Sequence, residues 1–342
     1  MVDEGGGVSS TIGTNFVFAV RIPFPTNLSS HEHSRWSSIF FGLDLSEFPL
    51  RARLNLPRHL DIGHRLPEGA NHFSGPVPVL RKFKQPPIEK LDFIIAGAQK
   101  AGTSALADFL ETHPKIKMPH KDELHTTVQP ARHFFDDEER FAKSEIDYTP
   151  LQRGCVRKRK SILLGSCTPI YIYWKSAMER IWNYNSKIKL LILLRNPAER
   201  AFSHWNMQRD RHLESLDFLA AVQEEKNRAR EAMPFQLRKF SYVDRGFYAD
   251  QIERVFRYFP GEQVKVIKFE HFRREARKTL DAVCNFIGIE PLQNLNNVET
   301  GSTPYVRKMT RSERQYLVDL YKGDIDRLEK LLGWDCSDWK SA

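Results

Sequence analysis

A loop bracketed by two glycines, between a short apolar run and an amphipathic stretch, carries the first recognisable chemistry. Residues 93–96 are apolar and typical of a buried strand, and residues 106–110 place apolar side chains at the spacing of one helix face. Gly97 and Gly102 lie between them, where the missing side chains let backbone N–H groups approach a ligand. Those N–H groups and the start of the helix predict an anion site suited to phosphate.

The position of its lysine distinguishes this loop from the ATP-binding pattern G-x-x-x-x-G-K-[ST]. The glycine spacing is the same, but Thr103 directly follows Gly102, and the lysine, Lys100, lies inside the loop. We therefore expect the loop to bind phosphate while its cation reaches a different part of the ligand.

A second anion site is predicted where the next long apolar run ends. Residues 187–194 are mostly apolar, as in a central strand of a parallel sheet whose two faces are covered. Pro197 suits the first turn of a helix, so Arg195 stands at the strand's carboxyl end and Ser203 lies two turns into the helix. A guanidinium and a hydroxyl so placed can converge on one oxyanion, at the sheet edge where open α/β folds bind ligands.

Each motif alone is also typical of ordinary structure, but the two in this order are much more specific. Across residues 90–339 the sequence resembles the sulfotransferases that use 3′-phosphoadenosine 5′-phosphosulfate. Within them it is most similar to the glycan branch, which includes heparan sulfate N- and 3-O-sulfotransferase domains and soluble bacterial relatives. The resemblance implies an α/β fold with a P-loop-like central parallel β-sheet flanked by helices. It also implies sulfuryl transfer to a hydroxyl or amine of a carbohydrate-like acceptor, with release of 3′-phosphoadenosine 5′-phosphate.

The resemblance assigns residues to the donor site. It implies that Lys100 contacts the 5′-phosphate and the bridging oxygen, that Arg195 and Ser203 hold the 3′-phosphate, and that a loop at residues 301–307 closes the site. The implied donor-binding residues are Gly97, Gln99, Lys100, Ala101, Gly102, Thr103, Ser104, Arg195, Ser203, Tyr305 and Arg307.

The chemistry of the transfer can be argued from the residues as well. Sulfuryl transfer is the sulfur analogue of phosphoryl transfer, so positioning and charge stabilisation should supply most of the rate. Lys100 beside the bridging oxygen would stabilise the charge that grows on the leaving phosphate. No metal is expected, because the sulfate carries less charge than a γ-phosphate and no Walker-B-type acidic strand end is visible.

The acceptor's proton requires a base, and the segment after the first helix offers one. The glycan branch carries a catalytic glutamate just before a His-Phe-Phe run, and Glu123 is the matching position. Residues 126–132 separate Glu123 and His125 from the run at His133, where the family has them nearly adjacent. The predicted catalytic residues are Lys100, Glu123 and His125, and His133 is an alternative if the extra segment displaces Glu123.

Two further segments relate to the acceptor side. Ser166 and Cys167 stand where the family often has a glutamate or a lysine before a Thr-Pro pair, so no such role is expected there. Arg245 and Tyr248 lie in a segment that matches the family's acceptor-side loop, and we expect them to face the acceptor.

The chain of 342 residues divides by composition into two parts. Residues 1–87 are rich in glycine and proline with poor periodicity, which predicts an irregular or partly disordered extension. Residues 88–342 alternate strand and helix patterns, which predicts one α/β domain with a parallel sheet.

Net charge, the length of apolar runs and cysteine spacing limit which binding partners and which location are expected. The net charge of +9 suits an anionic nucleotide and an anionic acceptor, and no nucleic acid is expected because the basic cluster at residues 157–160 has no interleaved aromatics. No apolar run is long enough to cross a membrane, and no secretory signal pattern opens the chain, so we expect a cytoplasmic protein. The four cysteines lack metal-ligand spacing, and their positions are Cys155, Cys167, Cys284 and Cys336.

Two alternatives and one question stay open at this point. A P-loop kinase would turn over ATP with Mg²⁺, and a nucleotide-binding protein without sulfotransfer activity would bind the nucleotide and transfer nothing. Glycan, lipid-linked sugar and small aglycone are all compatible with the sequence as acceptors, because fold alone does not determine substrate.

Overall fold

The computed structural model describes residues 90–118, 133–151, 161–292 and 304–341, and the backbone of two strands nearer the N-terminus. Those strands, β1 (Ser9–Ile12) and β2 (Phe16–Ala19), pair in an antiparallel hairpin. They belong to a separate unit, Met1–Arg81, whereas all other described elements belong to Lys82–Ala342. Apart from the hairpin, the predicted extension at residues 1–87 lies outside the described residues.

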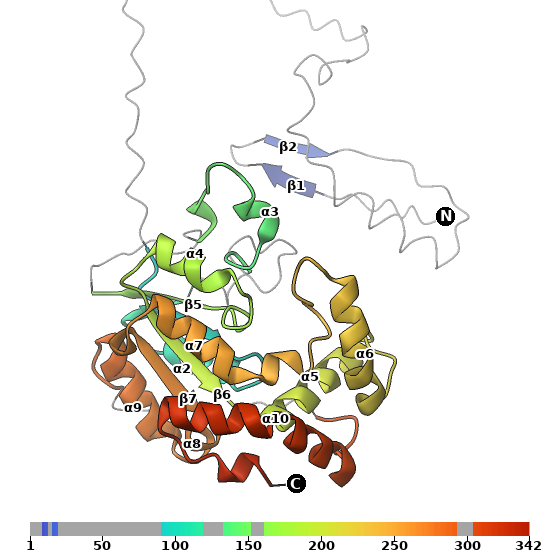
Figure 1. The fold of residues 1–342 in the computed structure, drawn as a ribbon. Coiled ribbons are helices and arrows are strands. Elements are labelled where there is room, and N and C mark those ends of the chain that lie inside the picture. Colours follow the sequence, from blue (N-terminus) through green and yellow to red (C-terminus); the bar gives the residue numbers. More distant parts are fainter. Residues whose placement is uncertain are drawn as a thin grey trace, which may run out of the picture. The chain divides into compact units, whose positions relative to one another are not determined.

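A five-stranded parallel sheet forms the centre of the larger unit (Figure 1). Its order is β4 (Ile116–Lys117), β5 (Leu163–Cys167), β3 (Phe93–Gly97), β6 (Lys189–Leu194) and β7 (Val264–Lys268). Every neighbouring pair is parallel. The two strands that precede the predicted anion sites, β3 and β6, are direct neighbours in register, with Ile95 opposite Leu191. The predicted fold class is confirmed.

Helices flank this sheet on both faces, as predicted. They are α2 (Thr103–Glu111), α3 (Glu138–Phe141), α4 (Ala177–Tyr184), α5 (Pro197–Asp210), α6 (Phe218–Glu231), α7 (Tyr248–Tyr258), α8 (Phe269–Arg274), α9 (Ala276–Ile287) and α10 (Arg311–Leu332). Figure 1 shows α7 and α10 side by side, and the two helices are in contact. A 3₁₀ turn, η4 (Asp244–Gly246), immediately precedes α7.

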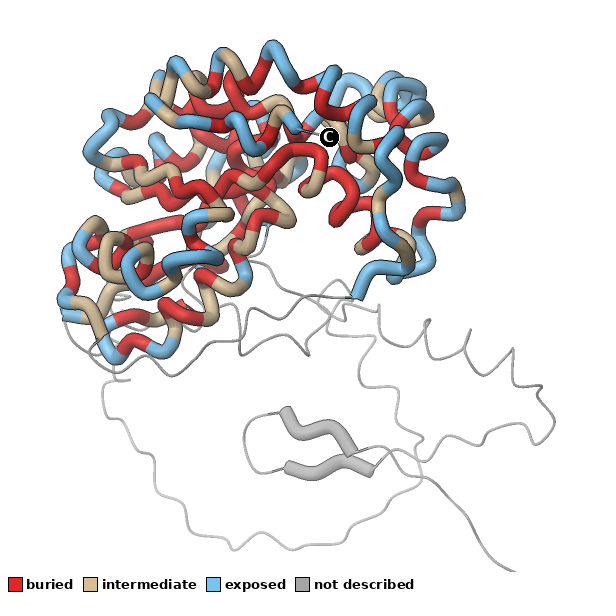
Figure 2. Tube along the Cα trace, turned by 90° about the horizontal axis from the view of Figure 1, so that it is seen from below, coloured by how far each residue is buried: buried red, intermediate tan, exposed pale blue. Residues whose placement is uncertain are grey.

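The core lies between the sheet and these helices, where buried residues gather in Figure 2. All five leucine and isoleucine side chains of β6 are buried, as expected for a central parallel strand. Burial of each such side chain stabilises the fold by about 1.5–3 kcal/mol relative to exposure. On α7, Tyr248, Ile252 and Val255 are buried at helical spacing, so one stripe of the helix faces the core.

Helix α5 begins at Pro197, as the sequence predicts, and its first turn is capped. The Asn196 side chain accepts hydrogen bonds from the backbone N–H groups of Ala198 (3.0 Å) and Glu199 (3.3 Å). Such a cap stabilises a helix start by about 1 kcal/mol. The cap also sets the direction in which α5 leaves β6. It thereby sets the position of Arg195, at the end of β6, relative to the side chains of α5.

Two features are absent from the described ranges. No helix there has both the length and the apolar character needed to cross a bilayer. No group of three or more His, Cys, Asp or Glu side chains is arranged there to hold a metal ion.

Candidate active site

The predicted phosphate loop joins β3 to α2 at the carboxyl edge of the sheet. The backbone N–H of Ala98 donates to the Leu193 carbonyl of β6 (2.6 Å), which ties the start of the loop to the neighbouring strand. Gly102 is the N-cap of α2 with φ +86°, and no side chain caps the helix. A Cβ at Gly102 would lie 2.7 Å from the ring of Phe269, so both the conformation and the close packing require glycine.

The structure brings the eight residues of this loop together. Gly97, Ala98, Ala101 and Thr103 are buried, Gln99, Lys100 and Gly102 are partly buried, and Ser104 is exposed in the first turn of α2. Lys100 itself has φ +70°, a conformation that is uncommon outside glycine. A loop that combines two left-handed residues with a helix start is well suited to direct N–H groups at an anion.

Arg195 follows β6 and reaches this loop. Its Nη1 donates to the Lys100 carbonyl (3.4 Å), and its Nη2 donates to the Tyr305 hydroxyl (3.4 Å) and to Glu199 Oε2 (3.4 Å). The guanidinium also lies 5.3 Å from the ring centre of Phe269. The two anion sites predicted from distant parts of the sequence therefore meet at one place.

The charges around Lys100 are mostly positive. Burial lowers the pKa of its ammonium, and the nearby Arg195, Arg211 and Arg200 lower it further. Asp210 acts in the opposite direction, but only as the smallest influence. Positive charges held together at low exposure create a strong field, which a bound anion would neutralise.

One face of α5 lies beside the predicted second anion site. Glu199, Phe202, Ser203 and Asn206 follow one another at i, i+3, i+4 and i+7 and therefore share this face. Ser203 is buried and lies one turn from Glu199, which contacts Arg195. The structure thus places the predicted Ser203 hydroxyl on the face of α5 that adjoins Arg195.

The predicted residues of the closing loop, Tyr305 and Arg307, both lie against the ring of Phe202 but have different polar partners. Tyr305 has its hydroxyl at Arg195 and its ring 5.6 Å from that of Phe202. Arg307 instead donates to both carboxylate oxygens of Glu313 (2.6 and 2.9 Å), and this pairing raises its pKa. Tyr305 therefore joins the site directly, whereas Arg307 has a carboxylate partner of its own on α10.

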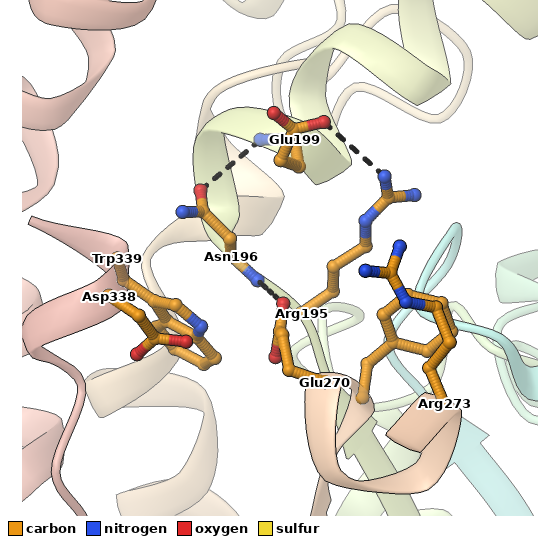
Figure 3. A pocket seen from close by; sticks show the side chains of 8 residues that line it. Arg195, Asn196, Glu199, Glu270, Arg273, Asp338 and Trp339 are labelled. Atoms are coloured by element: carbon orange, nitrogen blue, oxygen red, sulfur yellow. Dashed lines mark hydrogen bonds and ion pairs between the residues drawn. The ribbon is translucent and has the colours of Figure 1, made fainter. Parts of the chain in front are cut away.

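A pocket of about 330 Å³ opens beside Arg195 (Figure 3). Arg195 and Arg273 lie on one side of it, and Trp339 and Asp338 lie on the other. Its lining residues are Arg195, Asn196, Glu199, Phe269, Glu270, Arg273, Asp338 and Trp339. Sequence reasoning did not assign Arg273 or Trp339 to the site. Arg273 follows the end of β7 at the same sheet edge, and that position was the signal that could have identified it.

The acceptor-side residues are only partly described. Glu123, His125 and residues 126–132 lie outside the described residues. His133 is described, and its Nδ1 lies 2.9 Å from Oδ2 of Asp136, whose side chain is completely buried. Arg238 also donates to Asp136, through Nη1 to Oδ2 and through Nη2 to its carbonyl (2.5 Å).

The ionisation of Asp136 follows from these contacts. Burial alone would raise its pKa, but the hydrogen bond from His133 and the charge and hydrogen bond of Arg238 outweigh burial and lower it. An ionised carboxylate only accepts hydrogen bonds, so Nδ1 of His133 is the donor. In the neutral ring, Nε2 of His133 is then the nitrogen that carries the lone pair. About half of the His133 side chain is exposed to solvent.

The expectation that Arg245 and Tyr248 face the acceptor is wrong, because both side chains are buried. Arg245 donates to Gln99 Oε1 of the phosphate loop, to the Arg238 carbonyl and to Ser241 Oγ (2.7 Å). The Tyr248 hydroxyl donates to the carbonyl of Arg195 (2.9 Å). Both residues therefore contact the predicted donor-binding segments from inside the protein.

Comparisons with known proteins agree with this geometry. Residues 90–316 match the family model for the sulfotransferase domain. Heparan sulfate glucosamine 3-O-sulfotransferase 5 of Mus musculus is 25% identical over 227 residues, which are 61% of this chain and 57% of that protein. Bifunctional heparan sulfate N-deacetylase/N-sulfotransferase 3 of Mus musculus is 26% identical over 273 residues, 70% of this chain and 29% of that protein. The chain thus spans little more than half of the length of the first relative and less of the second.

A solved structure is similar to this chain over most of its length. The crystal structure of a sulfotransferase from Alicyclobacillus acidocaldarius superposes with a TM-score of 0.60 at 29% identity. The match covers 74% of this chain and 100% of that one.

Proposed function

The chain belongs to the sulfotransferase domain family, and on that premise we propose that it transfers a sulfuryl group from 3′-phosphoadenosine 5′-phosphosulfate to a carbohydrate-like acceptor. The observation that carries the proposal is the meeting of Lys100 and Arg195, whose Nη1 donates to the Lys100 carbonyl at 3.4 Å. A donor with one phosphate on the 5′ side of its ribose and another on the 3′ side needs two neighbouring anion sites. A nucleotide with 5′-phosphates alone would use only the loop.

The donor is proposed to bind along the sheet edge from the loop to the pocket. Backbone N–H groups of the loop, the hydroxyls of Thr103 and Ser104, and the Lys100 ammonium would hold the 5′-phosphosulfate. Arg195, together with Ser203 and Tyr305, would hold the 3′-phosphate. A guanidinium suits this task because its fork donates two parallel hydrogen bonds to a phosphate.

Lys100 is proposed to act on the leaving group. When the acceptor oxygen or nitrogen attacks sulfur in line, the S–O bond to the 5′-phosphate breaks and its electron pair stays on the phosphate oxygen. The field of Lys100 and the three arginines that lower its pKa is already present before the reaction and would stabilise this growing charge. Stabilisation of a charge that exists mainly in the transition state raises kcat more than affinity.

Glu123 is the proposed base, and His125 or His133 is proposed to serve instead if residues 126–132 displace Glu123. The contact between His133 and Asp136 supports His133 as the second candidate, since the buried carboxylate orients the ring and directs the free lone pair to Nε2. The pH dependence of kcat/KM separates the two, because carboxylic acids as a class lose their proton at lower pH than imidazolium groups do. Replacement of the residue that acts as the base should remove the rise of kcat/KM with pH that reports deprotonation of that base.

A glycan or glycoconjugate is the proposed acceptor. Support comes from the heparan sulfate sulfotransferases among the relatives, at about a quarter identity. The net charge of +9 is compatible with an anionic acceptor such as a uronate-containing chain.

Two experiments test the function in sequence. Calorimetric titration with 3′-phosphoadenosine 5′-phosphate, without metal, should give micromolar binding, and 5′-AMP should bind much more weakly. Preference for ATP with Mg²⁺ would instead favour the kinase alternative.

Transfer of radiolabelled sulfate from the donor to heparosan, N-desulfated heparan sulfate and p-nitrophenol would then identify the acceptor class. Donor binding with no transfer to any of a broad acceptor panel would favour a nucleotide-binding protein without catalysis.

A further inference from the structure

A buried amide on α5 holds the backbone beside Tyr305. Asn206 is 1% exposed, and its Nδ2 donates to the Pro304 carbonyl (3.2 Å). Its Oδ1 accepts from the backbone N–H of Val306 (2.8 Å). The carboxamide therefore pairs with the main chain on both sides of Tyr305, much as a neighbouring strand would, and depends on no side chain of the loop.

These two bonds determine where the Tyr305 side chain lies. Pro304, Tyr305 and Val306 are all exposed to solvent, so little apolar burial holds them in place. With its flanking peptide groups paired to Asn206, Tyr305 has its ring against Phe202 and its hydroxyl 3.4 Å from Arg195 Nη2. Without the amide, this segment would have to be ordered each time a ligand binds, at a cost in conformational entropy.

The far end of the same loop is held separately. Arg307 is paired with Glu313, and Glu313 also accepts from the Thr310 N–H (2.8 Å) in the capping box of α10. Arg314, the residue after Glu313, donates to Glu199 of α5, which also accepts from Arg195. The loop thus stays attached to α10 even if Asn206 is replaced, so a variant there should change Tyr305 more than the fold.

From these contacts we propose that Asn206 is a positioning residue that holds Tyr305 at Arg195 and thereby raises the preference of the site for a nucleotide with a 3′-phosphate. This inference rests on the proposed function. Asn206 itself does not touch the nucleotide. Asn206 holds the backbone of residues 304–306, and this backbone positions the Tyr305 hydroxyl beside Arg195.

The test compares neutral variants with a matched control on the same helix. Asn206→Ala removes both hydrogen bonds, and Asn206→Leu removes them while keeping most of the volume. Gln208 is the control, since it is also buried on α5 and its Nε2 donates to a backbone carbonyl (2.6 Å), but to that of Lys239 rather than to the closing loop. Gln208→Ala therefore loses the same kind of bond without touching Tyr305.

Affinities for 3′-phosphoadenosine 5′-phosphate and for 5′-AMP should be measured by calorimetry for each variant. For Asn206→Ala and Asn206→Leu we expect the ratio of the two affinities to fall about tenfold, the effect of one well-placed hydrogen bond. Affinity for 5′-AMP should stay close to that of the wild type, and Gln208→Ala should keep the wild-type ratio. If the alanine variant does not fold, the leucine variant provides the same comparison.

A double-mutant cycle tests the route through Tyr305. Tyr305→Phe removes only the hydroxyl, and we expect its effect on the ratio to vanish in the Asn206→Ala background, because the ring is no longer held at Arg195. Amide hydrogen exchange at Val306 should also be faster in Asn206→Ala without any nucleotide.

The outcomes separate the two proposals. A wild-type protein without preference for the 3′-phosphate would overturn the proposed function and this inference with it. A wild-type preference that survives in both Asn206 variants, or that falls equally in Gln208→Ala, would overturn the inference alone. Additive effects of the Asn206 and Tyr305 changes would show that Asn206 does not act through Tyr305.

Discussion

At the scale of residues, the site depends on positively charged side chains held close to one another. Lys100 and Arg195 are both cations, yet they contact each other through the Lys100 carbonyl. Glu199 compensates part of this charge, because Arg195 and Arg314 both donate to it. Such an arrangement prepares the site for an anion.

Replacement of Lys100 should affect turnover more than donor affinity. For Lys100→Ala we expect kcat to fall on the order of 10²–10³-fold, the usual cost of losing one group that stabilises transition-state charge. The Kd for 3′-phosphoadenosine 5′-phosphate should change less, measured by calorimetry. Lys187→Ala, at an exposed lysine before β6, is the control. Unchanged turnover in Lys100→Ala would exclude a role at the leaving group.

Replacement of Arg195 should affect recognition of the 3′-phosphate. Arg195→Ala should weaken binding of 3′-phosphoadenosine 5′-phosphate by about 1.5–3 kcal/mol, the range for hydrogen bonds to charged groups. Binding of 5′-AMP should weaken much less. Equal losses for the two nucleotides would mean that Arg195 does not contact the 3′-phosphate.

At the scale of elements, the ends of β3, β6 and β7 assemble the site. Arg195 follows β6, the phosphate loop follows β3, and Phe269, which begins α8 directly after β7, packs on Gly102. The loop can hold its shape only while the ring of Phe269 and the glycine fit against each other.

Two glycine-to-alanine replacements test this packing, and their expected effects on the free energy of unfolding have opposite signs. Gly102→Ala should lower the free energy of unfolding by about 1–3 kcal/mol, because φ is +86° and the new Cβ would meet the Phe269 ring. Gly323→Ala, inside α10 with nothing within 4 Å of the new Cβ, should raise it by about 0.5–1 kcal/mol. Denaturant unfolding measures both. A Gly102→Ala variant as stable as Gly323→Ala would contradict the close approach.

At the scale of the whole molecule, a buried acid connects α6 to the turn before α7. Glu225 accepts hydrogen bonds from the N–H groups of Val243 (2.6 Å) and Asp244 (2.8 Å). Burial nevertheless raises the pKa of its carboxyl to about 7, and the bonds and the charge of Arg200 oppose this only in part. The folded protein therefore binds this proton more tightly than the unfolded chain does.

The pH dependence of global stability follows from that shift. The contribution of protonated Glu225 is fully present below the ordinary pKa of about 4.5 and is lost as pH rises through about 7. Glu225→Gln keeps a neutral side chain of the same shape at every pH. We expect its stability relative to the wild type to rise between pH 4.5 and 7, by about 3 kcal/mol at most. A difference that stays constant over this range, measured by denaturant unfolding, would contradict the raised pKa.

Local patterns in the sequence were enough to predict β3, β6, the start of α5 and the glycine loop, whereas the two-residue strand β4 and the β1–β2 hairpin were not predicted. A run of apolar residues, a proline at a helix start and a glycine at φ +86° each reflect preferences of a few neighbouring residues. The family resemblance rested on the same short segments and is confirmed by the family model. The roles of the predicted site residues stay predictions.

Only the tertiary structure could decide which distant groups meet. Asn206 and Val306, beside Tyr305, lie 100 residues apart in the sequence, and Arg245 and Gln99 lie 146 residues apart. No local preference marks such pairs, because the packing of α5 and α7 against the sheet creates them. For the same reason the resemblance of its segment to the family's acceptor-side loop favoured an acceptor role for Arg245, although the fold buries it beside Gln99 of the phosphate loop. Sequence thus determined which chemical groups are available, and tertiary packing decided which of them reach the ligand and which hold the others in place.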